Sequence, residues 1–264
     1  MKLSLLIPVL NYEEALGETI ERLREVLGDD DVEILVVFDV TKPELREQVE
    51  RLGIELAESV DVRSLVRLDE RGFGSGLRHA AQHATGEALL PIMADLSDDV
   101  AAIPAMLQKI ADGANIVVGA RYVEGGRIVG DTPKQRLSRW YTWLMGTLTT
   151  VKCGDASNSF KMYRREVWET VEPRSHSFDL SVELVVKAAA FGYRIDQVPA
   201  TWVNRQAGRS NFRMVGELWN YSRWLLFAMF RLPSRWVIVA GLGLPLLVSW
   251  AVWRKPLARA SQRP

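Results

Sequence analysis

The sequence predicts an α/β domain with a layered, largely parallel sheet. In the first two-thirds of the chain, short apolar runs typical of buried strands alternate with segments of helical periodicity. Polar residues stand where several of these apolar runs end. With 264 residues, the chain is long enough to bury a core in one large domain or in one domain with an appendage.

Five apolar runs predict the buried strands of this sheet. They lie at residues 3–10, 32–39, 62–68, 87–95 and 114–121. Helices are predicted between them, at residues 13–27, from Pro43 onward, and at residues 74–85 and 100–113. The first helix carries an apolar stripe of Leu16, Ile20, Leu23 and Leu27, and the helix after the second strand opens with a proline, which is favoured in a first turn.

The later part of the chain is less regular. Residues 132–150 predict a helix rich in aromatic side chains, and residues 179–192 predict a second helix. Short strands are predicted at residues 159–165 and 193–203. Pro199 suits an edge position in the second of these strands, because proline cannot donate a hydrogen bond to a neighbouring strand.

Four polar residues follow strands of the predicted sheet, namely Asn11, Asp39, Asp95 and Arg121. Ligands of open α/β sheets bind outside the carboxyl ends of the strands, where these side chains would meet. Polar residues also end strands in sheets that bind nothing. The pattern alone therefore leaves a binding site and an ordinary polar edge both open.

The stretch IMADLSDD, residues 92–99, places Asp95, Asp98 and Asp99 close together behind an apolar run. Mg²⁺ is bound in many sites by one or two carboxylates together with phosphate oxygens of the substrate. Aspartate also begins helices, where its carboxylate accepts hydrogen bonds from backbone N–H groups. We assign the metal role to Asp95 and expect Asp98 and Asp99 to cap the following helix or to face solvent.

The C-terminal part of the chain has a membrane-like composition. Residues 213–231 are rich in Trp, Phe, Leu and Met, and residues 236–253 contain no charge in 18 positions. A helix of that length spans about 27 Å, close to the roughly 30 Å of a bilayer core. Tryptophans and basic residues flank the uncharged run, so it predicts a membrane helix preceded by an amphipathic interfacial helix. A buried hairpin in a soluble core is the alternative.

Charge and cysteine usage exclude some classes of function. Lys+Arg and Asp+Glu number 33 each, whereas a general nucleic-acid binder normally shows a basic excess. The single Cys153 cannot form an internal disulfide, and one Cys with three scattered His does not make a zinc site. The N-terminus does not have the pattern of a secretory signal peptide, because acidic residues follow its short apolar run at once.

Eight segments of the sequence carry a family resemblance. They are IPVLNYEE, EILVVFD, RGFGSGLRHAAQHATGE, MADLSDD, GARYVEGG, DASNSFKMYRREVWE, VELVVKAAAFGYRIDQVP and NRQAGRSNF. In order and spacing they resemble the inverting family 2 glycosyltransferases of the GT-A fold, in particular the dolichol-phosphate mannose synthase-like group, which glycosylates polyprenyl phosphates. The resemblance covers roughly residues 1–212 and implies a GT-A catalytic domain there. The composition of the remainder predicts an interfacial helix over 213–233 and a single transmembrane helix with a short basic tail over 234–264.

The resemblance also implies a role for particular residues. The nucleotide-sugar donor would be bound by Pro8, Asn11, Glu13, Asp39, Gly74 and Asp95. The acceptor phosphate would be bound by Arg121, Arg127, Arg205 and Ser210. Asp95 would hold Mg²⁺ or Mn²⁺, and the catalytic residues would be Asp95, Arg121 and Arg205. Glu183 matches a recurrent acidic position to which the sequence assigns no role.

The chain departs from the usual motifs of this family at several positions. The family usually has tyrosine where Leu10 stands, glutamate at Tyr12 and aspartate at Phe38. Its Asp-Ala-Asp motif has lost the first acid, because Met93 stands there, and the usual glutamine is Ser97. Residues 210–211 read Ser-Asn instead of Ser-Lys.

The function that the resemblance implies is transfer of a hexose from a nucleotide sugar, of GDP-mannose or UDP-glucose type, to a polyprenyl phosphate. The acceptor would be a dolichyl or undecaprenyl phosphate, the enzyme would be membrane-associated with its catalytic domain in the cytoplasm, and no nucleic acid would take part. One alternative is a lipid or glycan hydroxyl acceptor, which needs a base such as Asp98, Asp99 or Glu183. The other is a degenerate nucleotide-binding subunit, as Met93 and Phe38 suggest.

Overall fold

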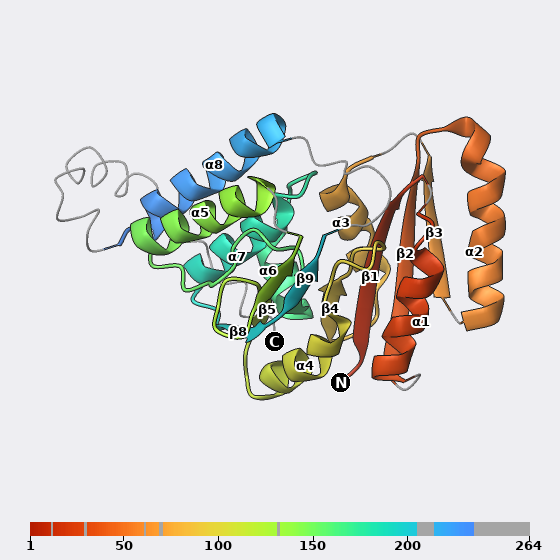
Figure 1. Cartoon of the computed structure of the whole chain (residues 1–264), viewed down its shortest axis with the longest axis horizontal. Helices are drawn as coiled ribbons and strands as arrows, with labels where there is room; N and C mark the ends of the chain where they lie inside the picture. The colour runs from red at the N-terminus through yellow and green to blue at the C-terminus, as the bar shows by residue number, and fades with distance from the viewer. Residues whose placement is uncertain are drawn as a thin grey trace, which may run out of the picture.

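A computed structural model of the chain describes residues 1–11, 13–28, 31–60, 62–68, 71–130, 133–204 and 214–234. A seven-stranded sheet with helices on both faces forms its centre (Figure 1). The strand order is β3-β2-β1-β4-β7-β5-β8. The strands of this sheet are β1 (Leu3–Leu10), β2 (Val32–Val40), β3 (Val62–Leu68), β4 (Ala88–Pro91), β5 (Ile116–Ala120), β7 (Lys161–Arg164) and β8 (Ile195–Pro199).

The sheet is parallel except at β7, which runs antiparallel between β4 and β5. Leu10 of β1 lies opposite Asp39 of β2, so these two strands end level with each other. The parallel strands all point their carboxyl ends to one edge, and the antiparallel β7 begins at that same edge. The predicted mixed, mostly parallel α/β sheet is confirmed.

The helices cover the two faces of the sheet and build two buried clusters. They are α1 (Leu16–Leu27), α2 (Arg46–Val60), α3 (Phe73–His83), α4 (Ile103–Ala111), α5 (Pro133–Leu148), α6 (Arg165–Val171), α7 (Leu180–Ala190) and α8 (Met214–Arg231), with single 3-10 turns at Pro43–Leu45 and Val100–Ala102. Side chains of α1, α2 and α4 enter one cluster, and those of α3 and α5 to α8 enter the other. Strand β1 shows why both clusters form: Leu5 and Ile7 point into the first cluster and Leu6 into the second, as strand alternation requires.

Two predicted strands differ from those in the structure. The strand predicted over residues 87–95 ends at Pro91, because the N–H of Met93 donates to the carboxylate of Asp98 and the chain turns at Leu96, which has a φ of 60°. The strand predicted over residues 193–203 divides into β8 and β9 (Thr201–Val203), and β9 pairs with β6 (Arg127–Val129) in a second, two-stranded sheet. Pro199 ends β8 at the edge of the main sheet, so its predicted edge position is correct.

Helix α8 is the last described element of the chain. It lies beside α5, as Figure 1 shows, and Tyr141 of α5 donates a hydrogen bond of 3.0 Å to the carbonyl of Tyr221. A helix over the predicted amphipathic segment is therefore present. None of the described helices is both long enough and apolar enough to span a bilayer. The membrane helix predicted over residues 236–253 lies outside the described residues, as do Arg205 and Ser210.

Candidate active site

The carboxyl edge of the sheet brings together residues that are far apart in sequence. Asn11 follows β1, and its backbone N–H donates to the carbonyl of Asp39 at the end of β2, at 2.9 Å. Asp95 follows β4, the other neighbour of β1, and Arg121 follows β5. All four strand-end residues therefore lie along one edge, which makes this edge the candidate site.

Asp39 and Arg67 form a buried ion pair at one end of this edge. Their side chains are 8% and 7% exposed, and an Nη2 to Oδ1 distance of 2.6 Å joins them. The Nε of Arg67 donates to the same carboxylate at 2.7 Å, and the N–H of Gly72 donates to it at 3.1 Å. The Asp39 carboxylate thus orders the start of α3 as well as the end of β2.

The other residues predicted to bind the donor surround this pair. The side chain of Asn11 accepts from the N–H of Thr41 at 2.8 Å, and its φ of 62° marks a sharp turn after β1. Pro8 lies below α3, 3.5 Å from where a Cβ on Gly76 would stand. Glu13 is half-buried in the turn before α1. Gly74 packs against backbone carbonyls of residues 175 and 177, so its place in the structure is explained by close packing.

The acidic stretch forms a tight loop in which each aspartate has a different environment. Asp95 Oδ1 accepts from the N–H of Ser97 at 3.2 Å, and Asp98 accepts from the N–H of Met93 at 2.8 Å. Asp99 accepts from the N–H of Thr201 at 2.7 Å, which ties the loop to β9. The expectation that Asp98 or Asp99 caps the following helix is wrong: Asp99 stands at the N-cap position, but its side chain makes no cap hydrogen bond there.

Asp98 is the most perturbed carboxyl of this loop. Burial raises its pKa to about 7, and the charges of Asp95 and Asp99 act in the same direction. The hydrogen bond from Met93 and the charge of Arg121 oppose this rise. Asp98 therefore lies in electrostatic reach of both Asp95 and Arg121, and its charge changes near neutral pH.

The acidic loop can offer a divalent cation one carboxylate, that of Asp95, and the substrate would have to supply the other oxygens. Within the described parts of the chain, no three His, Cys, Asp or Glu side chains converge as a metal cluster. A single carboxylate with substrate phosphates is a donor set that Mg²⁺ accepts. Asp95 is half-buried at the ligand edge, so it fits this role if the diphosphate of the donor supplies further oxygens.

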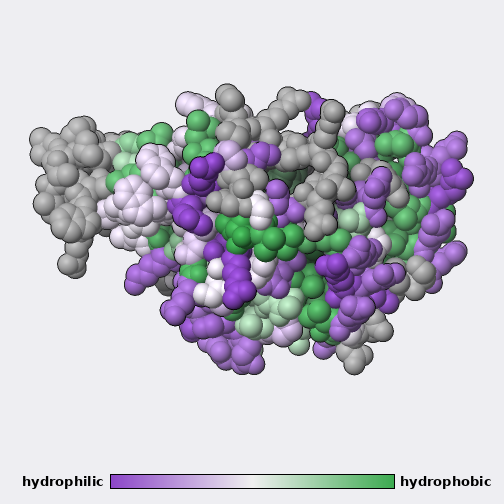
Figure 2. Space-filling model, in the orientation of Figure 1, coloured by the Kyte–Doolittle hydropathy of each residue, from purple (hydrophilic) through white to green (hydrophobic). Residues whose placement is uncertain are grey.

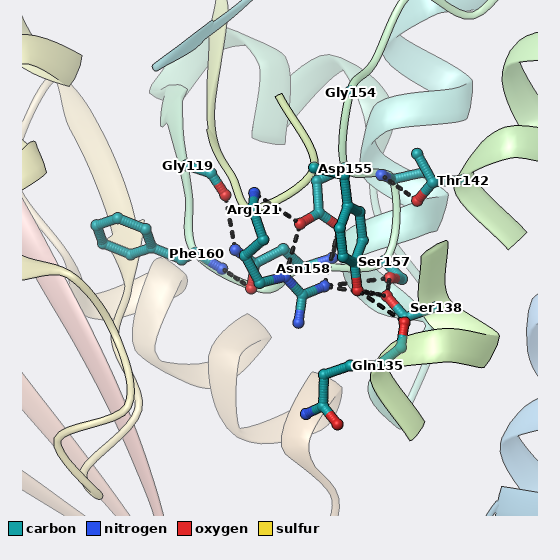
Figure 3. A network of polar contacts seen from close by, with 12 residues as sticks. Gly119, Arg121, Gln135, Ser138, Thr142, Gly154, Asp155, Ser157, Asn158 and Phe160 are labelled. Carbon is teal, nitrogen blue, oxygen red and sulfur yellow. Dashed lines mark hydrogen bonds and ion pairs between the residues drawn. The ribbon is translucent and has the colours of Figure 1, made fainter. Parts of the chain in front are cut away.

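Arg121 lies at the centre of the polar network in Figure 3. Its Nε and Nη2 donate to the two oxygens of Asp155 at 2.6 and 2.9 Å, and these side chains are 8% and 0% exposed. Nη2 also contacts Ser138 of α5 at 3.1 Å. Burial alone would lower the pKa of Arg121, but the Asp155 carboxylate raises it above its usual range. The guanidinium is fixed, and its Nη1 has no hydrogen-bond partner among the described residues.

Lys161 contacts the backbone of the segment that carries Asp155. It is fully buried at the start of β7 and donates to the carbonyls of Ala156 and Asn158, at 3.1 Å for Ala156. Burial lowers its pKa to about 8. The backbone from Asp155 to Asn158 is thereby held between Lys161 and Arg121.

Two further charged residues have different positions. Arg127 is exposed on β6, which pairs with β9, the strand that Asp99 contacts. Glu183 of α7 is 0% exposed; it accepts from the N–H groups of Arg174 and Ser175, at 3.0 and 2.7 Å, and pairs with Lys187. Glu183 therefore orders the loop before α7 and has no access to a substrate.

Comparison with known proteins identifies the family. The model of Glycosyl transferase family 2 matches residues 4–171, which is more than half of the chain. The chain belongs to glycosyl transferase family 2. The predicted family is thereby confirmed, and the matched range contains Asp39, Asp95, Arg121 and Asp155.

Curated relatives within this family are similar over most of the chain. A dolichol-phosphate mannosyltransferase from Pyrococcus furiosus is 28% identical over 216 residues, which are 81% of this chain and 60% of that protein. A bactoprenol glucosyl transferase from Shigella phage SfX is 29% identical over 226 residues, which are 83% of this chain and 70% of that protein. The chain thus spans less than two-thirds of the Pyrococcus protein.

Solved structures share the fold at lower sequence identity. Glucosyl-3-phosphoglycerate synthase from Mycobacterium tuberculosis, in complex with Mn²⁺, UDP and phosphoglyceric acid, superposes with a TM-score of 0.60 at 15% identity. The match covers 89% of this chain and 80% of that one. The GT-A-like fold expected from the sequence is confirmed.

The structure brings to the candidate site of this family 2 glycosyltransferase four further residues that sequence reasoning missed. They are Arg67, Ser138, Asp155 and Lys161. Asp155 and Lys161 lie in the segment DASNSFKMYRREVWE, which carried part of the resemblance, so that segment was the available signal. The sequence carries no such signal for Arg67 and Ser138, because each looks like an ordinary polar residue on a strand or a helix.

Proposed function

We propose that the protein transfers a hexose from a nucleotide sugar to a polyprenyl phosphate with inversion at the anomeric carbon. The observation that carries the proposal is the arrangement of the carboxyl edge, where Asp95 and the fixed guanidinium of Arg121 follow strands β4 and β5. The names of the curated relatives support a polyprenyl acceptor, and those of the solved relatives support a UDP-type donor.

The donor would lie over the ends of β1, β2 and β4. In this arrangement Asn11 and Asp39, at the ends of β1 and β2, would face the nucleotide, and Asp95, which follows β4, would face its diphosphate. A divalent cation bound by Asp95 and the diphosphate would stabilise the negative charge of the leaving group. Because Asp155 holds Nε and Nη2 of Arg121, the remaining Nη1 is oriented to donate to a phosphate oxygen without reorganisation.

The acceptor side of the reaction needs positioning more than it needs a base. A phosphate monoester is already anionic near neutral pH, so its oxygen can attack the anomeric carbon directly while the bond to the diphosphate breaks. The buried carboxylate of Glu183 accepts hydrogen bonds from two backbone N–H groups, and that of Asp99 accepts one from the N–H of Thr201. Neither is placed to remove a proton from an acceptor.

A hydroxyl acceptor is the second candidate, and Asp98 is the observation that favours it. A general base works best with a pKa near the operating pH, and the pKa of Asp98 is raised to about 7. Asp98 also lies in electrostatic reach of Asp95 and Arg121. The two candidates differ in whether the acceptor oxygen carries a proton.

Membrane attachment of the proposed enzyme is supported by the outer faces of α5 and α8. These faces expose large apolar side chains, namely Leu137, Trp140, Trp143, Leu218, Trp219, Leu226 and Phe230. Helix α5 contains three basic residues and no acidic one. In Figure 2, pale and green side chains over α5 and α8 are interspersed with purple ones. Tryptophan mixed with basic side chains is typical of surfaces that lie at the head groups of anionic bilayers.

The position of α5 links this surface to the site. Ser138 on its inner side contacts Arg121, while Trp140 is 60% exposed on its outer side. A protein docked through α5 and α8 would therefore hold its phosphate-binding edge close to the bilayer. The lipid tail of a polyprenyl acceptor could then stay in the membrane during transfer.

The proposed reaction is tested with the purified full chain in detergent. Labelled UDP-glucose and GDP-mannose are offered with Mn²⁺ or Mg²⁺, in one arm with a polyprenyl phosphate and in the other with the matching polyprenol. We expect a glycosyl-phosphoryl lipid of inverted configuration from one donor, lost on chelation and in Asp95→Asn, but retained in the exposed control Asp112→Asn. Transfer to the polyprenol alone would select the hydroxyl acceptor, and no transfer from either donor would overturn the proposal.

A further inference from the structure

The loop of residues 174–179 lies between α8, the last described helix, and the N-terminus of α3. On one side it contacts side chains of α8, and on the other it contacts backbone N–H groups of α3. Its first residues are fixed from a third side by the buried carboxylate of Glu183. The loop thus joins the last described helix to the first turn of α3, which borders the proposed nucleotide side of the candidate site.

Helix α8 holds the loop through four side chains, one of which is Tyr221, whose hydroxyl donates to the carbonyl of Phe178 at 3.5 Å. Arg223 Nη2 donates to Asp179 at 2.7 Å and to Ser175 Oγ at 2.9 Å. The indole Nε1 of Trp224 donates to the same Asp179 carboxylate, which is 1% exposed, at 2.8 Å. The hydroxyl of Ser177 donates to Glu217. Charge-assisted bonds to a buried carboxylate are stronger than neutral ones, so this attachment is specific.

The first turn of helix α3 contacts the loop of residues 174–179. The carbonyl of His176 accepts from the N–H groups of Gly74 and Ser75, at 3.0 and 3.3 Å. Phe73 and Phe178 stack with ring centroids 4.5 Å apart. A movement of residues 176–178 would therefore move the start of α3.

The start of α3 is bonded to the Asp39–Arg67 pair. Gly72 donates to Asp39 at 3.1 Å, and Arg67 Nη2 donates to Ser75 Oγ at 3.1 Å. Ser75 in turn donates to the carbonyl of Gly72 at 2.9 Å. Every step from α8 to the ends of β2 and β3 is thus a direct contact.

We propose that α8 is a positioning element for the nucleotide: by clamping residues 175–179, it fixes the first turn of α3 and, through it, Asp39. The inference rests on the proposed function in that it takes the ends of β1 and β2 as the donor side. Glu183 fixes the loop at Arg174 and Ser175, and the first turn of α7 donates hydrogen bonds to the carbonyls of Ser177 and Phe178. Helix α8 adds the side-chain contacts of Ser177 and Asp179, and α3 adds those of His176. Ser177, Glu217 and Trp224 act through α3 and do not touch the donor.

The test is nucleotide affinity, measured by titration calorimetry on the full chain in detergent with Mn²⁺ and either UDP or GDP. Ser177→Ala and Trp224→Phe each remove one donor of the clamp and keep the bulk of the side chain. Ser222→Ala is the matched control, because its hydroxyl only returns to the carbonyl of Leu218 on the same helix. We expect the double variant Ser177→Ala/Trp224→Phe to weaken nucleotide binding by about fivefold or more, and Ser222→Ala to leave it unchanged.

Rescue and hydrogen exchange separate positioning from general damage. Glu217→Gln keeps an oxygen that Ser177 can donate to, so it should bind nucleotide more tightly than Glu217→Ala. Hydrogen exchange of the backbone amides at residues 72–76 should accelerate in the variants of Ser177, Glu217 and Trp224, while exchange in β1 stays slow. A general loss of stability would accelerate exchange in both places. Unchanged affinity and unchanged exchange in the double variant would overturn the inference and leave the proposed function standing. A wild-type chain that binds neither nucleotide would overturn both.

Discussion

At the scale of single residues, the candidate site depends on two buried ion pairs, Asp39–Arg67 and Arg121–Asp155. Each joins a strand end to a residue that the sequence keeps far away. Removing one partner of such a pair leaves an uncompensated buried charge, which costs about 3–5 kcal/mol. Both pairs therefore fix the shape of the carboxyl edge before any substrate binds.

Asp155→Asn is expected to uncouple Arg121 from its position. The variant keeps the size of the side chain but removes the charge that holds Nε and Nη2, so the guanidinium loses its fixed orientation. We expect a loss in kcat/KM of about hundredfold, the order that a misplacement of roughly 1 Å causes. Ser138→Ala removes only one contact of Arg121, so its kcat/KM should fall much less. An equal fall in kcat/KM for both variants would contradict the central role of Asp155.

Asp98→Asn is expected to change how stability depends on pH. The folded pKa of Asp98 is raised to about 7, whereas an aspartate in the unfolded chain has a pKa of about 3.9. Between these values the unfolded state loses its proton first, so Asp98 lowers the free energy of unfolding as pH rises to about 7, with no further loss above. We expect denaturant unfolding in EDTA to show that the free energy of unfolding of Asp98→Asn rises relative to that of the wild type between pH 4 and 7. If the two free energies change in parallel with pH, the pKa of Asp98 is not raised.

At the scale of elements, the helices on one face carry tasks beyond packing. Helix α3 approaches the 175–177 backbone so closely that only glycine fits at residue 74: a Cβ there would lie 2.6 Å from the carbonyl oxygen of Ser175. Helix α5 contacts the site on one side and exposes tryptophan on the other. These close approaches make the helices sensitive to small changes in side-chain volume.

Gly74→Ala and Gly146→Ala should have opposite effects on stability. The first forces backbone oxygens of the neighbouring loop to move, and overpacking of this kind costs about 1–3 kcal/mol. The second lies in α5 with nothing within 4 Å of the added Cβ, so it should stabilise the helix by up to about 1 kcal/mol. Urea denaturation of both variants checks the signs, and a neutral Gly74→Ala would contradict the close contact.

At the scale of the whole molecule, every exposed tryptophan among the described residues lies on the neighbouring helices α5 and α8, together with Leu137, Leu218, Leu226 and Phe230. Helices α5 and α8 bury their inner stripes in one core cluster and leave the outer ones to solvent or lipid. Because Tyr141 bonds to the backbone of α8, the two outer faces keep a fixed relation. The membrane attachment proposed above would therefore hold the protein in one orientation at the bilayer.

Fluorescence quenching by brominated lipids tests that orientation on the full chain bound to anionic vesicles. Replacing Trp140 and Trp143 by Phe should lower the quenched fraction of the emission, since both would lie at the lipid. Replacing Trp168 by Phe should raise it slightly, because Trp168 is 8% exposed in the core and out of reach of lipid. Equal effects of the two replacements would show that α5 does not face the membrane.

The sequence by itself determined the fold class, the strand-end positions of Asn11, Asp39, Asp95 and Arg121, and the family. The fold class and the strand ends follow from local periodicity and from order along the chain, whereas the family follows from the resemblance of whole segments to known glycosyltransferases. The tertiary structure alone decided that Arg121 pairs with Asp155, that Asp39 pairs with Arg67, and that Glu183 is structural. It also separated Asp98 from Asp99, which looked alike as neighbours but bond to Met93 and Thr201. The bond of Asp98 to Met93 joins residues 5 positions apart, but the pairs Asp39–Arg67, Arg121–Asp155 and Asp99–Thr201 join residues 28, 34 and 102 positions apart. Which strands and loops lie side by side decides these three pairs, and no local pattern specifies that.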